Sequence, residues 1–319
     1  MARTRMDGWT LEFSIDRIDW MRLGATESEE TRARKRARLR RYIGRKAFME
    51  ARKEKTIWRV VRFVLLVGVY DPVEQDRTIP DYACETVKPL VDAGTDAKLW
   101  ADDDADHRVN TTYFAMRDRW GDGRYHLTFI VLPVSGDHDI NRQTMNQYRA
   151  LGAPGFSLKF NIRHNMWLTS NFNDSDLLAR QSGNHVYGSK QRFMGGVSPV
   201  NRKAARGNLI VSATQRWKDY RNVHMDGDYV TFAGIAYPSD NASDPDNATE
   251  TISCILGAGL YTGQLPSIMG RCGDVAVYKL AERSAPSYHT VRLDLFRRDE
   301  PLASVLSRVA KRDEERSVR

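Results

Sequence analysis

Alternating apolar and polar positions indicate the strands of this chain, and apolar positions at helical spacing indicate its helices. In the first half the predicted order is strand, helix, strand, helix, strand, strand, over residues 9–15, 32–55, 60–69, 83–94, 108–116 and 125–134. The second of these helices carries one apolar stripe, formed by Ala83, Val87, Leu90 and Val91. The last two strands are joined by a turn at Gly121-Asp122-Gly123, which predicts a hairpin.

The same order of elements returns in the second half, over residues 156–162, 203–220, 229–237, 248–259, 274–280 and 289–296. The polar segment 137–153 suits a linker, and residues 299–319 predict a short amphipathic helix with a charged end. We therefore expect an α+β chain of two tandem domains, residues 1–136 and 154–298. Each domain would be a small mixed or antiparallel sheet with helices on one side, and the two would form a pseudo-two-fold dimer.

Residue identities indicate that the two halves are copies of one domain. When Asp81 is aligned with Asp246, seven of the fifteen residues in 80–94 are identical to their counterparts in 245–259. The pairs are Pro80/Pro245, Asp81/Asp246, Ala83/Ala248, Glu85/Glu250, Thr86/Thr251, Ala93/Ala258 and Gly94/Gly259. Further on, Tyr125-His126 matches Tyr288-His289 after a two-residue deletion. Identity and element order together predict a tandem duplication, with a period far longer than that of solenoid repeats.

The chain is basic, with a formal net charge of +8 and a pI near 9.4, which favours a polyanionic partner. Residues 32–55 hold twelve Lys or Arg residues and, among acidic residues, Glu50 and Glu54. Such a run is either a solvated helix face or a phosphate-binding surface, and its density favours phosphate contact. The candidate DNA-binding residues in it are Arg34, Arg38, Arg41, Arg45 and Lys46.

No apolar run approaches the roughly 20 residues that cross a bilayer. No signal-peptide core precedes Trp9. Cys84, Cys254 and Cys272 form no CxxC pair, which argues for a reducing compartment and against a structural zinc site or a disulfide framework. We expect a cytoplasmic protein with no membrane partner.

Acidic residues lie at or near the ends of predicted helices and strands in both halves. They are Asp81, Asp92, Asp102 and Asp103 in the first half and Asp244 and Asp246 in the second. Metal-assisted phosphodiester hydrolysis needs carboxylates that hold Mg²⁺ and a cation, such as Lys88, that offsets charge on the phosphate. Alternatively, Asp81 and Asp246 are helix N-caps and residues 102–104 form a solvated acidic turn. Spacing alone leaves both interpretations open.

These motifs resemble those of RusA-like Holliday-junction resolvases, specifically a phage-encoded actinobacterial branch. In that family an Asp-x-Asp-Asn motif opens a helix that carries a lysine and a later aspartate, and an Asp-Asp pair follows. Asp244-Pro245-Asp246-Asn247 is the opening motif intact, and the first half offers Lys88, Asp92 and the pair Asp102-Asp103. Leu168-Thr169-Ser170-Asn171 resembles the early DNA-contact loop of the family, which makes Asn171 a candidate DNA-binding residue.

Each half also departs from the family pattern. The first has Ile79 and Tyr82 in place of the first Asp and the Asn, and the second has Ser253 in place of the lysine. The second also has Gly257 in place of the helix Asp and Ser267-Ile268 in place of the Asp pair. The losses are complementary. They permit a composite site across the two halves, one weakened site in the first half, or a binding protein without activity.

The resemblance implies a Mg²⁺-dependent (or Mn²⁺-dependent) endonuclease of phage or prophage origin that resolves four-way junctions in the bacterial cytoplasm. The implied catalytic residues are Asp81, Lys88, Asp102, Asp103, Asp244 and Asp246. The implied metal ligands are Asp81, Asp92, Asp102, Asp103, Asp244 and Asp246. We expect catalysis to depend on the first half, which keeps the lysine and the late Asp pair. The alternatives are an inactive protein of this fold that binds branched DNA and a phage structural or host-interaction protein that reuses the fold.

Overall fold

The computed structural model describes residues 8–22, 27–73, 80–118, 120–134, 139–153, 155–168, 202–238, 245–266 and 274–317, and of Asp81 and Asp246 it describes the backbone. The strands are β1 (Trp9–Ile15), β2 (Phe63–Tyr70), β3 (Arg108–Ala115), β4 (Tyr125–Pro133), β5 (Gly155–Arg163), β6 (Tyr229–Ala236), β7 (Val275–Lys279) and β8 (Tyr288–Arg297). The main helices are α1 (Glu29–Arg38), α2 (Arg45–Lys53), α3 (Cys84–Asp96), α4 (Ile140–Ala150), α6 (Arg202–Asp219), α7 (Thr249–Tyr261) and α8 (Leu302–Ser317). The short segments are the π-helix η1 (Leu39–Gly44) and the 3₁₀ turns η2 (Pro80–Ala83), η3 (His164–Met166) and η6 (Pro245–Ala248).

The strands form one mixed eight-stranded sheet in the order β1-β4-β2-β3-β7-β6-β8-β5. The α+β class and the mixed sheet are thus confirmed. In the first half β1 pairs antiparallel with β4, β4 antiparallel with β2, and β2 parallel with β3. In the second half β5, β8, β6 and β7 repeat this pattern. The two sets of four strands join where β3 pairs antiparallel with β7.

The register of the joining pair is symmetric. Thr112 lies opposite Ala276, Thr111 opposite Val277, and Tyr113 opposite Val275. A two-fold rotation about the Thr112–Ala276 pair therefore carries the Thr111–Val277 pair onto the Tyr113–Val275 pair. This is the pattern of an isologous contact. Helix α3 connects β2 to β3 and α7 connects β6 to β7, so the two helices occupy equivalent places in the topology.

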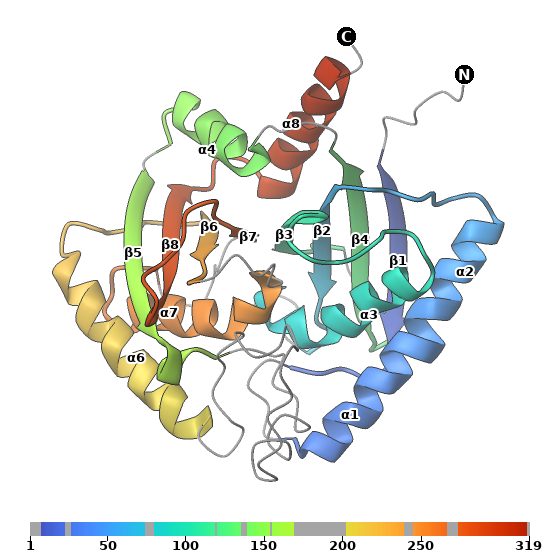
Figure 1. Cartoon of the computed structure of the whole chain (residues 1–319), viewed down its shortest axis with the longest axis horizontal. Coiled ribbons are helices and arrows are strands. Elements are labelled where there is room, and N and C mark those ends of the chain that lie inside the picture. Colours follow the sequence, from blue (N-terminus) through green and yellow to red (C-terminus); the bar gives the residue numbers. More distant parts are fainter. Residues whose placement is uncertain are drawn as a thin grey trace.

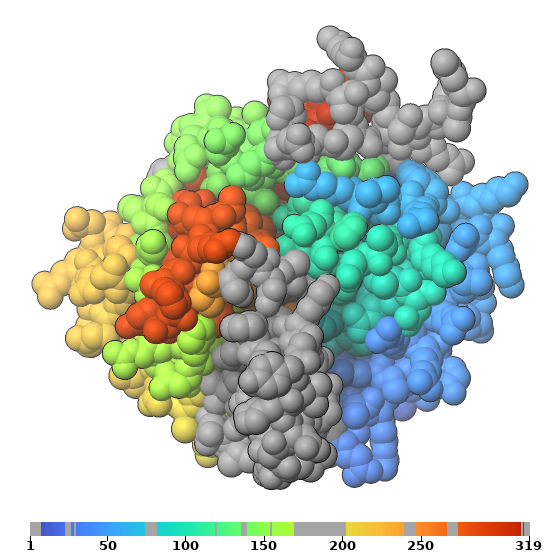
Figure 2. Space-filling model, viewed as in Figure 1, coloured from blue at the N-terminus to red at the C-terminus, as the bar shows by residue number. Residues whose placement is uncertain are grey.

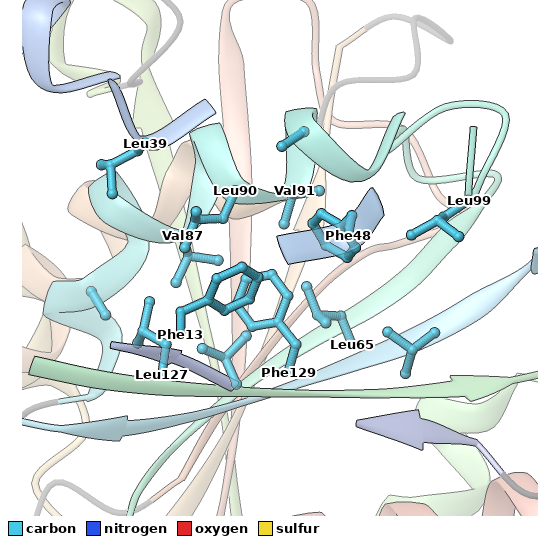
Figure 3. Close-up of a cluster of buried hydrophobic side chains, with 14 of the residues drawn as sticks. Phe13, Leu39, Phe48, Leu65, Val87, Leu90, Val91, Leu99, Leu127 and Phe129 are labelled. Atoms are coloured by element: carbon cyan, nitrogen blue, oxygen red, sulfur yellow. The ribbon is translucent and has the colours of Figure 1, made fainter. Parts of the chain in front are cut away.

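Helices cover both faces of the sheet, in contrast to the predicted helices on one side. In Figure 1 α3 and α7 lie below the strands, α6 and the α1–α2 helix run along the lower left and the right, and α4 and α8 lie above. The physical reason is that β2 and β6 are buried along their whole length. Phe63 and Leu65 face one core cluster and Val64 faces another, so each face of β2 needs a cover. Figure 3 shows Val87 and Leu90 of α3 pointing toward Leu127 and Phe129 of the sheet.

The segment expected to be a linker instead forms α4, which packs against α8. Its buried Ile140, Met145 and Tyr148 join the core cluster that spans both halves. In α8 the expected apolar stripe is present, because Leu302, Val305, Leu306 and Val309 are all buried. Together the two helices cover the sheet where its halves meet.

The expected hairpin between residues 108–116 and 125–134 was wrong. Strands β3 and β4 lie on opposite sides of β2, β3 parallel and β4 antiparallel to it. The reason is that α3 carries the chain from the end of β2 back to its start, so that β3 must run parallel to β2.

Several of the repeated residues hold each α3-type helix in place. The Thr86 hydroxyl accepts the Met21 N–H at 2.8 Å and donates to the Met21 carbonyl at 2.9 Å. In the second half Thr251 makes the same two bonds to Leu168, both at 3.0 Å. Thr86 and Thr251 thus anchor the helix to the chain that follows the edge strand β1 or β5.

The repeated glycines leave room for tryptophan rings. A Cβ atom at Gly94 would lie 2.1 Å from the Trp100 ring, and one at Gly259 would lie 2.7 Å from the Trp217 ring. Trp167 and Trp217 are themselves buried, so both rings pack in the core of the second half.

The strand registers correct the alignment of the last strands. Ile15 pairs with Tyr125, and Ile162 pairs with His289. Tyr125 stacks on Trp20 at 4.1 Å, and His289 stacks on Trp167 at 4.2 Å. Tyr125 therefore corresponds to His289 and not to Tyr288, with which the sequence alignment had matched it.

Candidate functional site

The two halves contact each other through side chains at the start of α3 and α7. The Lys88 ammonium, in the second turn of α3, donates a hydrogen bond to the Asn247 side-chain oxygen in η6. Asn247 is the last residue of the Asp-Pro-Asp-Asn motif and is buried. The predicted lysine of one half is thus adjacent to the opening motif of the other. Asp244 and the side chains of Asp81 and Asp246 lie outside the described residues, as does Asn171.

The predicted acidic pair, Asp102-Asp103, lies away from the contact between Lys88 and Asn247. Asp102 is exposed and accepts the Asp103 N–H at 2.8 Å, and Asp103 lies 3.8 Å from the buried Arg108 guanidinium at the start of β3. Asp81 precedes the first residue of α3, whereas this acidic turn follows its last residue. A helix of this length spans about 20 Å. The candidate catalytic residues of the first half are therefore divided between the two ends of α3.

Arg40 forms ion pairs with Asp92 and Asp96 near the C-terminal end of α3. Its guanidinium lies 3.4 Å from Asp92 and bonds Asp96 at 2.7 Å. The hydrogen bond from Arg40 lowers the pKa of Asp96, although partial burial acts in the opposite direction. Asp92, predicted as a metal ligand, is thus in an ion pair with a residue of the basic helix.

The described side chains do not by themselves supply a metal site. Within the described ranges, no three His, Cys, Asp or Glu side chains lie together as metal ligands. The predicted ligands Asp102 and Asp103 are adjacent in the chain, but among the described residues they belong to no three-ligand cluster. The assignment of metal ligands therefore depends on Asp81, Asp244 and Asp246.

The basic run forms one continuous helical segment, α1-η1-α2, as expected, but several of its charges are engaged inside the protein. Arg32 lies 2.7 Å from the buried Glu85, and Arg38 lies 2.7 Å from the buried Asp19. Lys35 also donates to the Trp20 carbonyl at 2.9 Å. These contacts attach the helix to α3 and to the turn after β1, so these charges serve the fold.

The remaining candidates lie on the outside of the helix. Arg34 and Lys46 are exposed and form i,i+4 ion pairs with Glu30 and Glu50. Arg41 and Arg45 are exposed and form no ion pair with a described residue. Arg41 and Arg45 are therefore the candidates whose charge is most available to an external phosphate.

The second half repeats the helix-to-helix ion pair. Glu250, the counterpart of Glu85, is buried and bonds Arg202 and Arg206 of α6, with Arg206 Nε 3.0 Å from its carboxylate. Burial acts to raise the pKa of Glu250, but the two guanidinium groups outweigh it and leave the pKa below its usual value. The identity of Glu85 and Glu250 thus has a structural reason.

No known protein-family model matches this chain, and no curated protein sequence matches it. Among the described residues, no helix combines the length and the apolar character that a membrane span requires.

Proposed function

We propose that this chain binds branched DNA of approximate two-fold symmetry, such as a four-way junction, and cleaves it by Mg²⁺-dependent phosphodiester hydrolysis. The contact between Lys88 and Asn247 carries the proposal. The first half keeps the lysine of the RusA-like pattern, and the second half keeps its opening Asp-x-Asp-Asn motif. The contact brings the lysine of one half next to the motif of the other, which supports one composite site.

The symmetry of the sheet supports a duplicated domain. The strand order and the register are the same on both sides of the Thr112–Ala276 pair. A fused pair of copies presents two related surfaces to a junction whose arms are also related by two-fold symmetry. One copy is then free to diverge while the other keeps its contacts.

In the proposed site Asp81, Asp244 and Asp246 would hold Mg²⁺, and Lys88 would offset the charge of the scissile phosphate. When bound, Mg²⁺ would lower the pKa of a coordinated water and stabilise charge on the phosphate oxygens. The position of Asp103 toward the other end of α3 favours this composite site over one confined to the first half.

The proposal is tested by cleavage of an end-labelled synthetic four-way junction with and without Mg²⁺. We expect Lys88→Met and Asp246→Asn each to reduce the cleavage rate at least about a hundredfold, with little change in junction affinity. Asp103→Asn serves as the matched control and should retain cleavage. Loss of cleavage in Asp103→Asn but not in Asp246→Asn would place the site in the first half instead.

A second candidate is a protein of the same fold that binds junctions without cutting them. The observation that favours it is that Asp92 and Asp103, which the family pattern would make metal ligands, are engaged with Arg40 and Arg108. Tight binding in a gel-shift assay, with no cleavage in Mg²⁺ or Mn²⁺, would support this candidate. Equal affinity for junction and linear duplex would contradict both.

A further inference from the structure

The second half contains a cavity of about 400 Å³ on the side of the sheet that carries α4 and α8. It lies beside the second half of β5, the end of β6, the start of β8 and the segment that leads into β8. Its walls include Lys159, Asn161, Arg283 and Tyr288. In Figure 2 the orange-red surface of this segment borders the yellow-green surface of β5.

The equivalent place in the first half is filled by aromatic rings. Tyr70 pairs with His126 across the strands, and Trp120 stacks on His126 with ring centroids 4.6 Å apart. The Tyr70 and Trp120 rings are 4.9 Å apart, and the Tyr70 hydroxyl donates to the Trp120 carbonyl. Three planar side chains therefore occupy this space in the first half.

The second half replaces each ring by a small side chain. In the register, Ala236 pairs with Thr290 as Tyr70 pairs with His126. Ser284 precedes Thr290 by the same six residues that separate Trp120 from His126. Ala236, Ser284 and Thr290 all line the cavity. The cavity is thus the space that the three rings take up in the other copy.

The charge at this place also differs between the halves. Thr290 pairs with Asn161 and His126 pairs with Ser14, so Lys159 stands where the first half has Glu12. The lining holds two cations, Lys159 and Arg283, and one carboxylate, Glu282. Thr290 donates to the Asn161 side-chain oxygen at 2.9 Å. The cavity therefore combines room for a planar ring with a net positive wall and an amide.

We propose that this cavity binds a single nucleotide, with the base in the space vacated by the rings and the phosphate on Lys159 and Arg283. A volume of this size lies within the range of small-molecule sites. The Tyr288 ring in the wall offers a stacking surface for the base. The choice of a nucleotide over other planar anions rests on the proposed action on DNA.

The nucleotide can come from an unpaired position in branched DNA or from the free pool, and two probes distinguish these sources. The first is deoxyadenosine monophosphate, whose affinity is measured by calorimetry on the full chain. The second is a bulged duplex with a fluorescent adenine analogue at the unpaired position. Quenching of the analogue on binding reports its entry into an aromatic environment.

We expect Lys159→Glu, which installs the first-half residue, to weaken binding of the monophosphate about tenfold or more. The combined change Ala236→Tyr, Ser284→Trp and Thr290→His should abolish it by filling the cavity, with the thermal unfolding curve as a check on the fold. Glu12→Lys is the matched control. It should leave the affinity for the monophosphate unchanged, because aromatic rings fill the corresponding space in the first half.

Loss of monophosphate binding in both cavity variants, with unchanged quenching of the bulged duplex, would identify a free nucleotide as the ligand. Loss of both signals would identify an unpaired nucleotide of DNA. Unchanged affinity and unchanged quenching in Lys159→Glu would overturn the proposal, even if the filled variant does not fold. Junction cleavage, measured separately, reports on the proposed function and not on this cavity.

Discussion

The basic helix offers a quantitative test of DNA binding. Arg41 and Arg45 lie on its exposed side without an ion pair to a described residue, whereas Arg38 is bound to the buried Asp19. Replacement of both Arg41 and Arg45 by glutamine removes two charges and leaves the internal contacts of the helix in place. We expect weaker junction binding and a smaller dependence on salt.

The size of the change follows from counterion release. Each phosphate contact contributes about 0.9 to the slope of log K against log salt for duplex DNA, so two contacts contribute about 1.8. Between about 50 and about 200 mM salt, the wild-type protein should therefore lose about tenfold more affinity than the Arg41→Gln, Arg45→Gln variant.

The assay is a fluorescence-anisotropy titration of a labelled junction at four or more salt concentrations. Arg38→Gln is the matched control, since it removes one charge of the same helix. Its slope should stay near the wild-type value, while its free energy of unfolding falls by about 1–3 kcal/mol because Asp19 loses its partner. An unchanged slope in the double variant would refute the assignment of Arg41 and Arg45 to phosphate contact, and an equal drop in Arg38→Gln would refute the division of roles.

Three further predictions concern the repeated contacts and the buried histidine. Thr86→Val and Thr251→Val each leave a buried N–H and a buried carbonyl without a partner, so urea unfolding should show a loss of about 2–4 kcal/mol in each. Gly94→Ala should cost about 1–3 kcal/mol by the same measurement, because the new Cβ overlaps the Trp100 ring. Burial lowers the pKa of His289 to about 3, so the unfolded chain binds the extra proton first and stability falls as the pH drops from about 6.5 toward 3. His289→Tyr, which installs the first-half residue, should reduce this loss of stability in thermal unfolding measured from about pH 7 to about pH 4. An unchanged pH profile would show that His289 is not its source.

The elements of this chain could be predicted because their signals are local. Alternation located the strands, and the offset between Asp81 and Asp246 aligned the two helices at the register that the structure shows. The segment 137–153 held a local signal that was missed. Ile140, Met145 and Tyr148 are spaced for one helix face, but the surrounding polar residues favoured a linker.

The contacts that define the candidate site could not be predicted, because they join distant parts of the chain. Lys88 and Asn247 are 159 residues apart, and no local pattern indicates their contact. The ion pairs of Arg32 with Glu85 and of Arg38 with Asp19 were invisible for the same reason. As a result the prediction for the basic run contained none of these internal ion pairs. The order of strands about β2 likewise depends on the crossover through α3 and not on the strand sequences.

The residues that the two halves share and the residues in which they differ have different roles. Thr86/Thr251, Glu85/Glu250 and Gly94/Gly259 are shared, and their contacts hold a helix against the sheet or against a neighbouring helix. These identities therefore indicate a repeated fold and carry no information about a retained active site.

Two of the differences lie where the halves meet and at the cavity. Lys88 corresponds to Ser253, so the lysine that contacts the Asp-Pro-Asp-Asn motif exists on one side of the interface. Tyr70 corresponds to Ala236, so a ring in the first half takes the place of a small residue that lines the cavity in the second. A chain that served only as a symmetric scaffold would have no physical need for either asymmetry. Function is therefore to be sought at the interface and in the cavity, and the variants that exchange residues between the halves are the direct way to test it.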